Sequence, residues 1–336
     1  MRDPENNDQL SALPLETCEQ FGFLEAVQSE LEQVHVRINQ LLRAPNEQIA
    51  ECLRILAGQT GKMLRPSLVL LSGKCFGPIG PAHIDLAAMV ELLHRASLLH
   101  DDVIDSAELR RDKKTANILW GNTAAVLLGD FLLSQAFYLG TKVPFAEAGD
   151  IMSRTAQDLC CGELQQNFQQ GNWEISEQQY FQLIDAKTAA LFRCSCQLGA
   201  IAVKASDEQI QAFGEFGTEL GIAFQITDDL LDMTGNEQET GKTLGTDLLQ
   251  GKCTLPVIHW IHQHQEQKNQ RIDQLKQGCS MQMLVEEMKQ SGSLDAAVAQ
   301  AQWRISQATE HLEVIPPSQA KDSLSALLSY VADRIK

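Results

Sequence analysis

The sequence predicts an all-α fold, and three observations support that prediction. Apolar residues recur at steps of three and four along most of the chain, which is the spacing of one face of an α-helix. No proline occurs between Pro144 and Pro256, so long helices can run there without interruption. Alternating patterns, which are typical of half-buried strands, are scarce. We therefore expect a single all-α bundle.

The helical spacing begins after residue 20 and returns repeatedly. The segments that show it are 24–41, 86–104, 124–139, 180–202, 210–231 and 323–335. Glycine, proline and polar residues gather at 73–83, 140–150 and 234–245, which we expect to be loops. Residues 1–20 are polar, contain two prolines and lack the spacing, so we expect a flexible arm. Residues 21–336 would then form one domain.

Composition narrows the function and the location. The chain is 44% hydrophobic and 21% charged, which is typical of a soluble globular protein. Its net charge of −17 argues against a nucleic-acid partner. The polar, acidic start is unlike a signal peptide, and the most apolar run, AAVLLGDFLL, is interrupted by Asp130. We expect a cytoplasmic protein without a membrane span.

The cysteines predict no chemistry of their own. There are nine, and no two show the C-x-x-C spacing of zinc or redox sites. The odd number favours free thiols in a reducing compartment.

Two acidic motifs of identical spacing point to a metal site. They consist of Asp101, Asp102 and Asp105, and of Asp228, Asp229 and Asp232. On a helix, residues four apart lie one turn above each other, so each motif stacks like charges among apolar neighbours. Such a stack needs a positive counter-charge. Carboxylates without His or Cys favour Mg²⁺, which also binds the oxygens of substrate phosphates.

Basic residues in several short stretches of the sequence could bind those phosphates. Arg110 and Arg111 follow the first motif, and a guanidinium suits bidentate binding of phosphate oxygens. The others are Lys62 and Arg65 in GKMLRP, Lys187 in DAKTAALF, Lys242 in TGKTLGTD and Lys252 in QGKCTLP. Each alone would be an ordinary surface residue. The GKTLGTD stretch is not a Walker loop, because the glycine five residues before Gly241 is absent.

Together these stretches resemble the trans-isoprenyl diphosphate synthases, or polyprenyl synthetases, and most closely the medium- and long-chain members. The resemblance runs from about residue 24 to the end of the chain. It is carried, in family order, by GKMLRP, ELLHRASLLHDDVIDSAELRR, GNTAAVLLGDFLL, GELQQ, DAKTAALF, FQITDDLLD and GKTLGTDLLQGKCTLP. The resemblance implies an antiparallel bundle around a central cavity and a homodimer.

The resemblance also implies roles for individual residues. The six aspartates would hold three Mg²⁺ ions that bind the allylic diphosphate. Further allylic diphosphate contacts would come from Arg110, Lys187, Lys242 and Lys252. Isopentenyl diphosphate would be bound by Lys62, Arg65, His94 and Arg111. We expect His100 to be structural.

The implied reaction is the elongation of an allylic diphosphate by isopentenyl diphosphate. Metal and cations stabilise the leaving diphosphate, so the C–O bond breaks toward an allylic carbocation. In the family, Thr188 and Gln225 turn side-chain oxygens toward that cation, and Lys187 assists. Released diphosphate takes the final proton, so no histidine base is required.

Product length is expected to depend on Ala96 and Ser97. An aromatic at the fifth or fourth residue before the first aspartate gives short products in the family, and both residues here are small. We expect a product of more than twenty carbons, with growth stopped deeper, by residues such as Leu92, Phe137 or Tyr138.

The chain departs from the family pattern at two positions. Met63 stands where a basic residue is frequent, which predicts one fewer positive charge near the isopentenyl pocket. Cys253 precedes the usual threonine of the last motif.

Three alternatives remain open. A metal phosphohydrolase could use His100 with Asp101, although this leaves the second motif unexplained. A class I terpene cyclase shares the first motif but normally has a different second one. A non-catalytic or partner-dependent subunit of a heteromeric synthase would keep the fold, yet all six aspartates are present here.

Overall fold

The computed structural model confirms the all-α prediction. It describes residues 22–44, 46–58, 61–111, 113–235, 244–278 and 280–335. Within these residues the only strands are two residues long, Leu109–Arg110 (β1) and Lys113–Lys114 (β2), which pair as an antiparallel hairpin. The predicted arm of residues 1–20 lies outside the described part. The division of the chain into that arm and one domain stays a prediction.

The chain is organised as two compact units. The first contains residues up to Arg154 together with Cys194–Phe213 and Val314–Ala326. The second contains Thr155–Arg193, Gly214–Glu313 and the residues from Leu327 onward.

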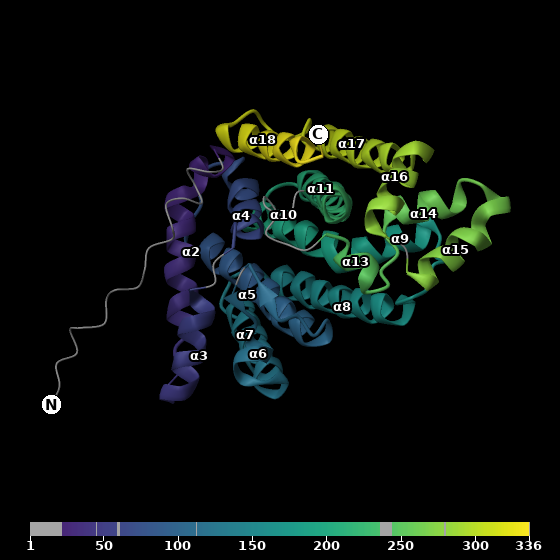
Figure 1. Ribbon diagram of the computed structural model, residues 1–336. Helices are drawn as coiled ribbons and strands as arrows, with labels where there is room; N and C mark the ends of the chain where they lie inside the picture. The colour runs from purple at the N-terminus through teal and green to yellow at the C-terminus, as the bar shows by residue number, and fades with distance from the viewer. Residues whose placement is uncertain are drawn as a thin grey trace. The chain divides into compact units, whose positions relative to one another are not determined.

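Helices α5 and α7 form the centre of the first unit. The elements before α8 are η1 (Gly22–Val27), α2 (Gln28–Leu41), α3 (Glu47–Ala57), α4 (Leu64–Lys74), α5 (Pro81–Ile104), α6 (Ala116–Trp120) and α7 (Asn122–Gly140). Helix α5 contacts α2, α4 and α7, and it lies side by side with α7 in Figure 1. Leu86, Met89 and Leu92 of α5 are fully buried, and so are Ala87, Ala88 and Val90 between them, so this part of α5 is enclosed on all sides.

The second unit has its own core around α14. The remaining elements are α8 (Ala146–Gln169), α9 (Glu177–Ile184), η2 (Asp185–Ala189), α10 (Ala190–Ala202), α11 (Asp207–Thr234), α13 (Thr246–Leu249), α14 (Leu255–His262), η3 (Gln265–Gln267), α15 (Lys268–Gln277), α16 (Met281–Ser291), α17 (Ser293–His311) and α18 (Gln319–Asp333). Helix α14 contacts α9, α15, α16 and α17 (Figure 1). Trp260 of α14 is completely buried in this core.

The apolar periodicity predicted where the helices lie, but not which turns in them are 3-10 or π-helical. The first predicted helix begins as a 3-10 turn, η1, before the α-helical part starts. The predicted helix 180–202 is interrupted by a π-helical turn, η2, between α9 and α10. Both deviations are short and are followed directly by α-helix, so a spacing of three and four residues could not reveal them.

One described helix is long and apolar enough to cross a membrane. This helix is α7, which has a mean hydropathy of 1.3 and is 33% buried over its apolar stretch. A core helix of a globular protein can be equally long and apolar, and α7 packs against α5. Asp130 therefore does not by itself exclude α7 as a membrane span.

Candidate active site

The first acidic motif lies at the C-terminal end of α5. Asp105 caps this helix, and its backbone N–H donates to the carbonyl of Asp101. The negative end of the helix dipole adds to the charge of the carboxylates there, which increases the demand for a cation. Asp102 differs from its neighbours because it is 3% exposed and accepts hydrogen bonds from Arg110 through Nε at 2.9 Å and Nη2 at 2.8 Å. The middle aspartate is thus already paired within the protein.

The β-hairpin after α5 presents the two arginines. Thr115 and Asn117 donate side-chain hydrogen bonds to the carbonyl of Ala107, which fixes both ends of this short segment. Arg111 occupies the tight turn with a φ of 52°, a left-handed conformation that is costly for a residue with a side chain. Arg110 turns to Asp102, as described above. Such strain is most often retained where the position of a side chain matters.

A basic cluster forms where the GKMLRP segment meets α5. Arg65 Nη1 donates to His94 Nε2 at 3.1 Å. A Cβ on Gly61 would lie 2.7 Å from both terminal nitrogens of Arg111, so the guanidinium packs directly on the backbone beside Lys62. The structure therefore brings together Arg65, His94 and Arg111, three of the residues that the resemblance assigned to isopentenyl diphosphate, and the fourth, Lys62, directly follows Gly61.

His94 is held neutral in this cluster. Burial lowers its pKa well below 6.5, and the charge of Arg65 lowers it further, followed by Arg95, Arg111 and Arg110. Since an arginine can only donate, Nε2 of His94 is the acceptor and Nδ1 carries the proton. The neutral imidazole adds no positive charge that would repel the neighbouring arginines, and it can donate one hydrogen bond.

The second acidic motif, on α11, also has a buried middle aspartate. Asp229 is 3% exposed and accepts from the Tyr180 hydroxyl at 2.6 Å and from Gln225 Nε2 at 2.7 Å. Burial raises its pKa well above 3.8, and the nearby carboxylate of Asp247 adds to this, while the two hydrogen bonds oppose it. Burial and Asp229 also raise the pKa of Tyr180 well above 10.0, so the phenol stays protonated and donates.

Gln225 links Asp229 to Thr188. The Thr188 hydroxyl donates to Gln225 Oε1 at 2.7 Å, and this bond fixes which way the amide points. The structure thus brings together two of the residues expected to face the carbocation. Their oxygens lie beside each other, with Thr188 bonded to Gln225.

The outer aspartates of the second motif have different partners. Asp228 pairs with Arg334 at 2.7 Å, and that arginine lies over the Phe224 ring. Asp232 accepts the backbone N–H groups of Thr246 and Asp247 at 3.2 and 3.1 Å, where α13 begins. Both carboxylates remain at least partly exposed, unlike Asp229.

Lys187 lies on the π-helical turn. Its ammonium pairs with Glu163 of α8, in the GELQQ stretch. A Cβ on Gly162 would lie 2.8 Å from the Lys187 backbone nitrogen, so only glycine allows α8 to approach this turn so closely. A π-helical turn rotates the side chains that follow it, and such turns are frequent at functional sites.

Six residues that interact with the predicted site residues were not predicted from the sequence. They are Glu91, Arg95, Glu163, Tyr180, Asp247 and Arg334. Asp247 had a local signal, because it lies in the GKTLGTD stretch, and Lys252 Nζ approaches it at 4.0 Å. Glu91, Arg95 and Glu163 also lie in quoted stretches, ELLHRASLLHDDVIDSAELRR and GELQQ, whereas Tyr180 and Arg334 contact Asp229 and Asp228 from distant parts of the chain and had no such signal. Lys242 lies outside the described residues.

The expected chain-length residues lie on α5. Ala96 is buried, and the Ser97 hydroxyl donates to the carbonyl of His94. Leu92, one turn earlier, is completely buried. Phe137 and Tyr138 on α7 are 44% and 48% exposed, so in the single chain these two side chains are not part of a packed floor.

The donor set fits a hard cation, although no complete metal cage is formed. In the described residues, no three His, Cys, Asp or Glu side chains converge as a metal site. The outer aspartates of each motif are carboxylates one turn apart, the pattern Mg²⁺ uses when waters and substrate oxygens complete its coordination. An incomplete protein cage is therefore compatible with magnesium bound together with a diphosphate.

Comparison with known proteins identifies the family. The polyprenyl synthetase family model matches residues 46–291. The chain belongs to this family. It is 36% identical over 308 residues to heptaprenyl diphosphate synthase component 2 of Bacillus subtilis, covering 91% of this chain and 88% of that one. It is 34% identical to octaprenyl diphosphate synthase of Escherichia coli, covering 82% and 86%.

Solved structures agree with this assignment. The decaprenyl diphosphate synthase of Rhodobacter capsulatus has a TM-score of 0.88 and 33% identity, with 94% of this chain and 99% of that one covered. The Caulobacter crescentus polyprenyl synthase, solved with calcium and isoprenyl diphosphate, has a TM-score of 0.85 and 30% identity, with 92% and 96% covered. The chain is a prenyltransferase that condenses isopentenyl diphosphate with an allylic diphosphate.

The family assignment removes two of the alternatives, and the structure adds a reason. His100 Nε2 lies 3.2 Å from the carbonyl of Val126, and among the described residues His100 and Asp101 belong to no group of three possible metal ligands. The phosphohydrolase and cyclase alternatives are therefore wrong, whereas a requirement for a second subunit stays open.

Proposed function

We propose that this synthase makes an all-trans polyprenyl diphosphate of more than twenty carbons, using one basic site for isopentenyl diphosphate and a separate acidic, metal-dependent site for the allylic diphosphate. The observation that carries the proposal is the basic cluster of Lys62, Arg65, His94 and Arg111. A cyclase or a hydrolase has a single diphosphate to bind and no use for a second anion site. An elongating enzyme needs one.

We assign the metal to the outer aspartates. Asp101, Asp105, Asp228 and Asp232 would hold Mg²⁺, three ions per site, which neutralise the leaving diphosphate. The middle aspartates then act through the protein, since Asp102 orients Arg110 and Asp229 orients Gln225. Arg110, Lys187, Lys242 and Lys252 would contribute further positive charge to the allylic diphosphate.

In the proposed reaction the allylic C–O bond breaks and its electron pair leaves with the diphosphate. The isopentenyl double bond then attacks the allylic carbon to form the new C–C bond. Thr188 and Gln225 supply oxygens that stabilise the carbocation, and their mutual hydrogen bond keeps them oriented. The proton lost from the resulting cation passes to the released diphosphate.

The proposed product length rests on the small residues before the first motif. Ala96 and Ser97 are not aromatic, so neither side chain would block a growing prenyl chain just below the first acidic motif. Relatives named as heptaprenyl, octaprenyl and decaprenyl synthases favour a long product.

We further propose a cytoplasmic homodimer. Helices α6 and α7 carry exposed large apolar side chains, which are Ile118, Leu119, Val126, Leu127, Phe137 and Tyr138. A second protein surface would remove them from water. Light scattering that finds only a monomer would contradict this proposal.

A second candidate is a catalytic subunit that needs a partner protein. The relative named heptaprenyl diphosphate synthase component 2 favours it, because that name describes one component of an enzyme. The aspartates argue for catalysis within this chain in either case.

One experiment tests the function and separates the two candidates. The purified protein is incubated with isopentenyl diphosphate, Mg²⁺ and each of three allylic primers, and the products are identified by mass. A series ending above twenty carbons supports the proposal. A fifteen-carbon product alone would refute the length, and turnover only after a second protein is added would favour the subunit candidate.

A further inference from the structure

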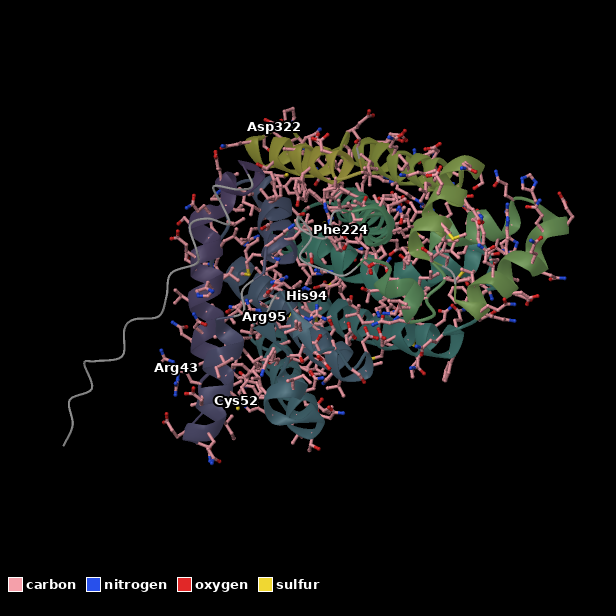
Figure 2. All side chains as sticks on the ribbon, viewed as in Figure 1. Arg43, Cys52, His94, Arg95, Phe224 and Asp322 are labelled. Atoms are coloured by element: carbon pink, nitrogen blue, oxygen red, sulfur yellow. The ribbon has the colours of Figure 1, made fainter. Side chains whose placement is uncertain are left out.

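A buried ion pair lies beside the basic cluster of the first unit. Arg95 follows His94 on α5, and Figure 2 labels both residues. Its Nε donates to Glu91 Oε1 at 2.8 Å, one turn earlier in the helix. The two side chains are only 10% and 5% exposed. Moving two full charges out of water is costly, and apolar residues of similar size would pack as well or better.

The two terminal nitrogens of Arg95 have poor hydrogen-bond partners. Nη2 lies 3.9 Å from the sulfur of Met63, a weak acceptor, and Nη1 is buried without a hydrogen-bond partner. Packing alone does not require an arginine here. Its charge is therefore the property to explain.

That charge acts on the residues of the basic cluster. Arg95 is among the groups that lower the pKa of His94, after burial and Arg65. It also opposes the charge on Arg111, while Glu91 favours it. The ion pair is consequently close enough to affect the potential in which a diphosphate would bind.

We propose that Arg95, which lies against Met63, is a positioning residue for isopentenyl diphosphate: its guanidinium neutralises Glu91 and so prevents an unpaired buried negative charge in the wall of that site. This inference rests on the proposed role of the basic cluster. The sequence predicted one fewer positive charge here because Met63 replaces a basic residue. The structure places a guanidinium against Met63 from the neighbouring helix α5.

Kinetic constants for the two substrates test this role. In Arg95→Met, Glu91 loses its counter-charge, and KM for isopentenyl diphosphate should rise about tenfold or more, because a buried unpaired charge opposes an anion. KM for the allylic diphosphate should stay within about twofold. A loss of structure alone would not separate the two substrates in this way.

Two double variants identify the charge as the cause. Glu91→Gln with Arg95→Met removes both charges, and Met63→Arg with Arg95→Met moves the positive charge to position 63. Both should return KM for isopentenyl diphosphate to within about threefold of the parent. If Arg95→Met alone does not fold, Arg95→Gln, which removes the charge but keeps a polar side chain, takes its place in the same comparison.

Three results would overturn the inference. They are an unchanged KM for isopentenyl diphosphate in folded Arg95→Met, equal increases in both KM values, and no recovery in either double variant. Arg65→Met serves as the reference. If Arg65→Met leaves KM for isopentenyl diphosphate unchanged, the assignment of the basic cluster fails; if it raises KM while Arg95→Met does not, only the present inference fails.

Discussion

The contact between Gly61 and Arg111 gives the sharpest test of the basic cluster. In Gly61→Ala, the new Cβ would lie 2.7 Å from Arg111 Nη1 and Nη2, while ordinary contacts begin near 3.4 Å, so the guanidinium must move by the difference, 3.4 − 2.7 = 0.7 Å. The end of a flexible arginine can move that far without disturbing the fold. A misplacement approaching 1 Å can cost up to about a hundredfold in rate, and we expect KM for isopentenyl diphosphate to rise about tenfold.

The assay is initial velocity at a saturating allylic primer, with melting temperature as the check on folding. Gly58→Ala is the matched control, because its Cβ would meet only ordinary contacts, the nearest at 3.6 Å. The control should change neither KM. If Gly61→Ala binds isopentenyl diphosphate as the parent does, or loses affinity for both substrates equally, the placement of Arg111 against this backbone is not what binds the substrate.

Three further predictions follow from the same contacts. Ala96→Phe should shorten the product, since Ala96 is 2% exposed and a ring cannot be absorbed by a packed wall; an unchanged product series by mass analysis would contradict it. Tyr180→Phe should lower the free energy of unfolding in urea by about 2 kcal/mol, because buried Asp229 loses one of the two side chains that donate to it, and an unchanged midpoint would argue against that bond. His94 has a pKa lowered in the folded state, so the parent should lose stability relative to His94→Gln as pH falls below 6.5; a difference independent of pH would mean that His94 is not held neutral.

The fold was predictable because burial leaves a period in the sequence. Each helix needs one apolar face, so segments such as 86–104 and 124–139 were located to within a few residues of α5 and α7. The π-helical turn could not be found in this way. It lies within an otherwise helical pattern, and the close approach of α8 to this turn at Gly162 involves residues that are far apart in the sequence.

The site was predictable as residue types but not as roles. Six aspartates of identical spacing look equivalent in the sequence, yet the middle one of each motif is buried. Arg110 pairs with Asp102 and precedes Arg111, which has the left-handed backbone conformation of this turn. Tyr180, 49 positions before Asp229, donates a hydrogen bond to it. Neither donor has a spacing rule that connects it to its acceptor.

This division of roles has a physical reason. Two stacked carboxylates can share a cation with a substrate phosphate, but a third in the same turn would add repulsion whenever the cation is absent. A buried middle aspartate that is bonded to Arg110, or to Tyr180 and Gln225, has donors that offset part of that repulsion. In return it orients the residues that must face the substrate.

Replacing the middle aspartates by Asn should therefore disturb the orientation of Arg110 and Gln225 more than metal affinity, whereas replacing the outer ones should weaken metal affinity directly. Magnesium titrations followed by calorimetry in the presence of inorganic diphosphate would distinguish these effects, and equal losses of affinity at all six positions would refute the division.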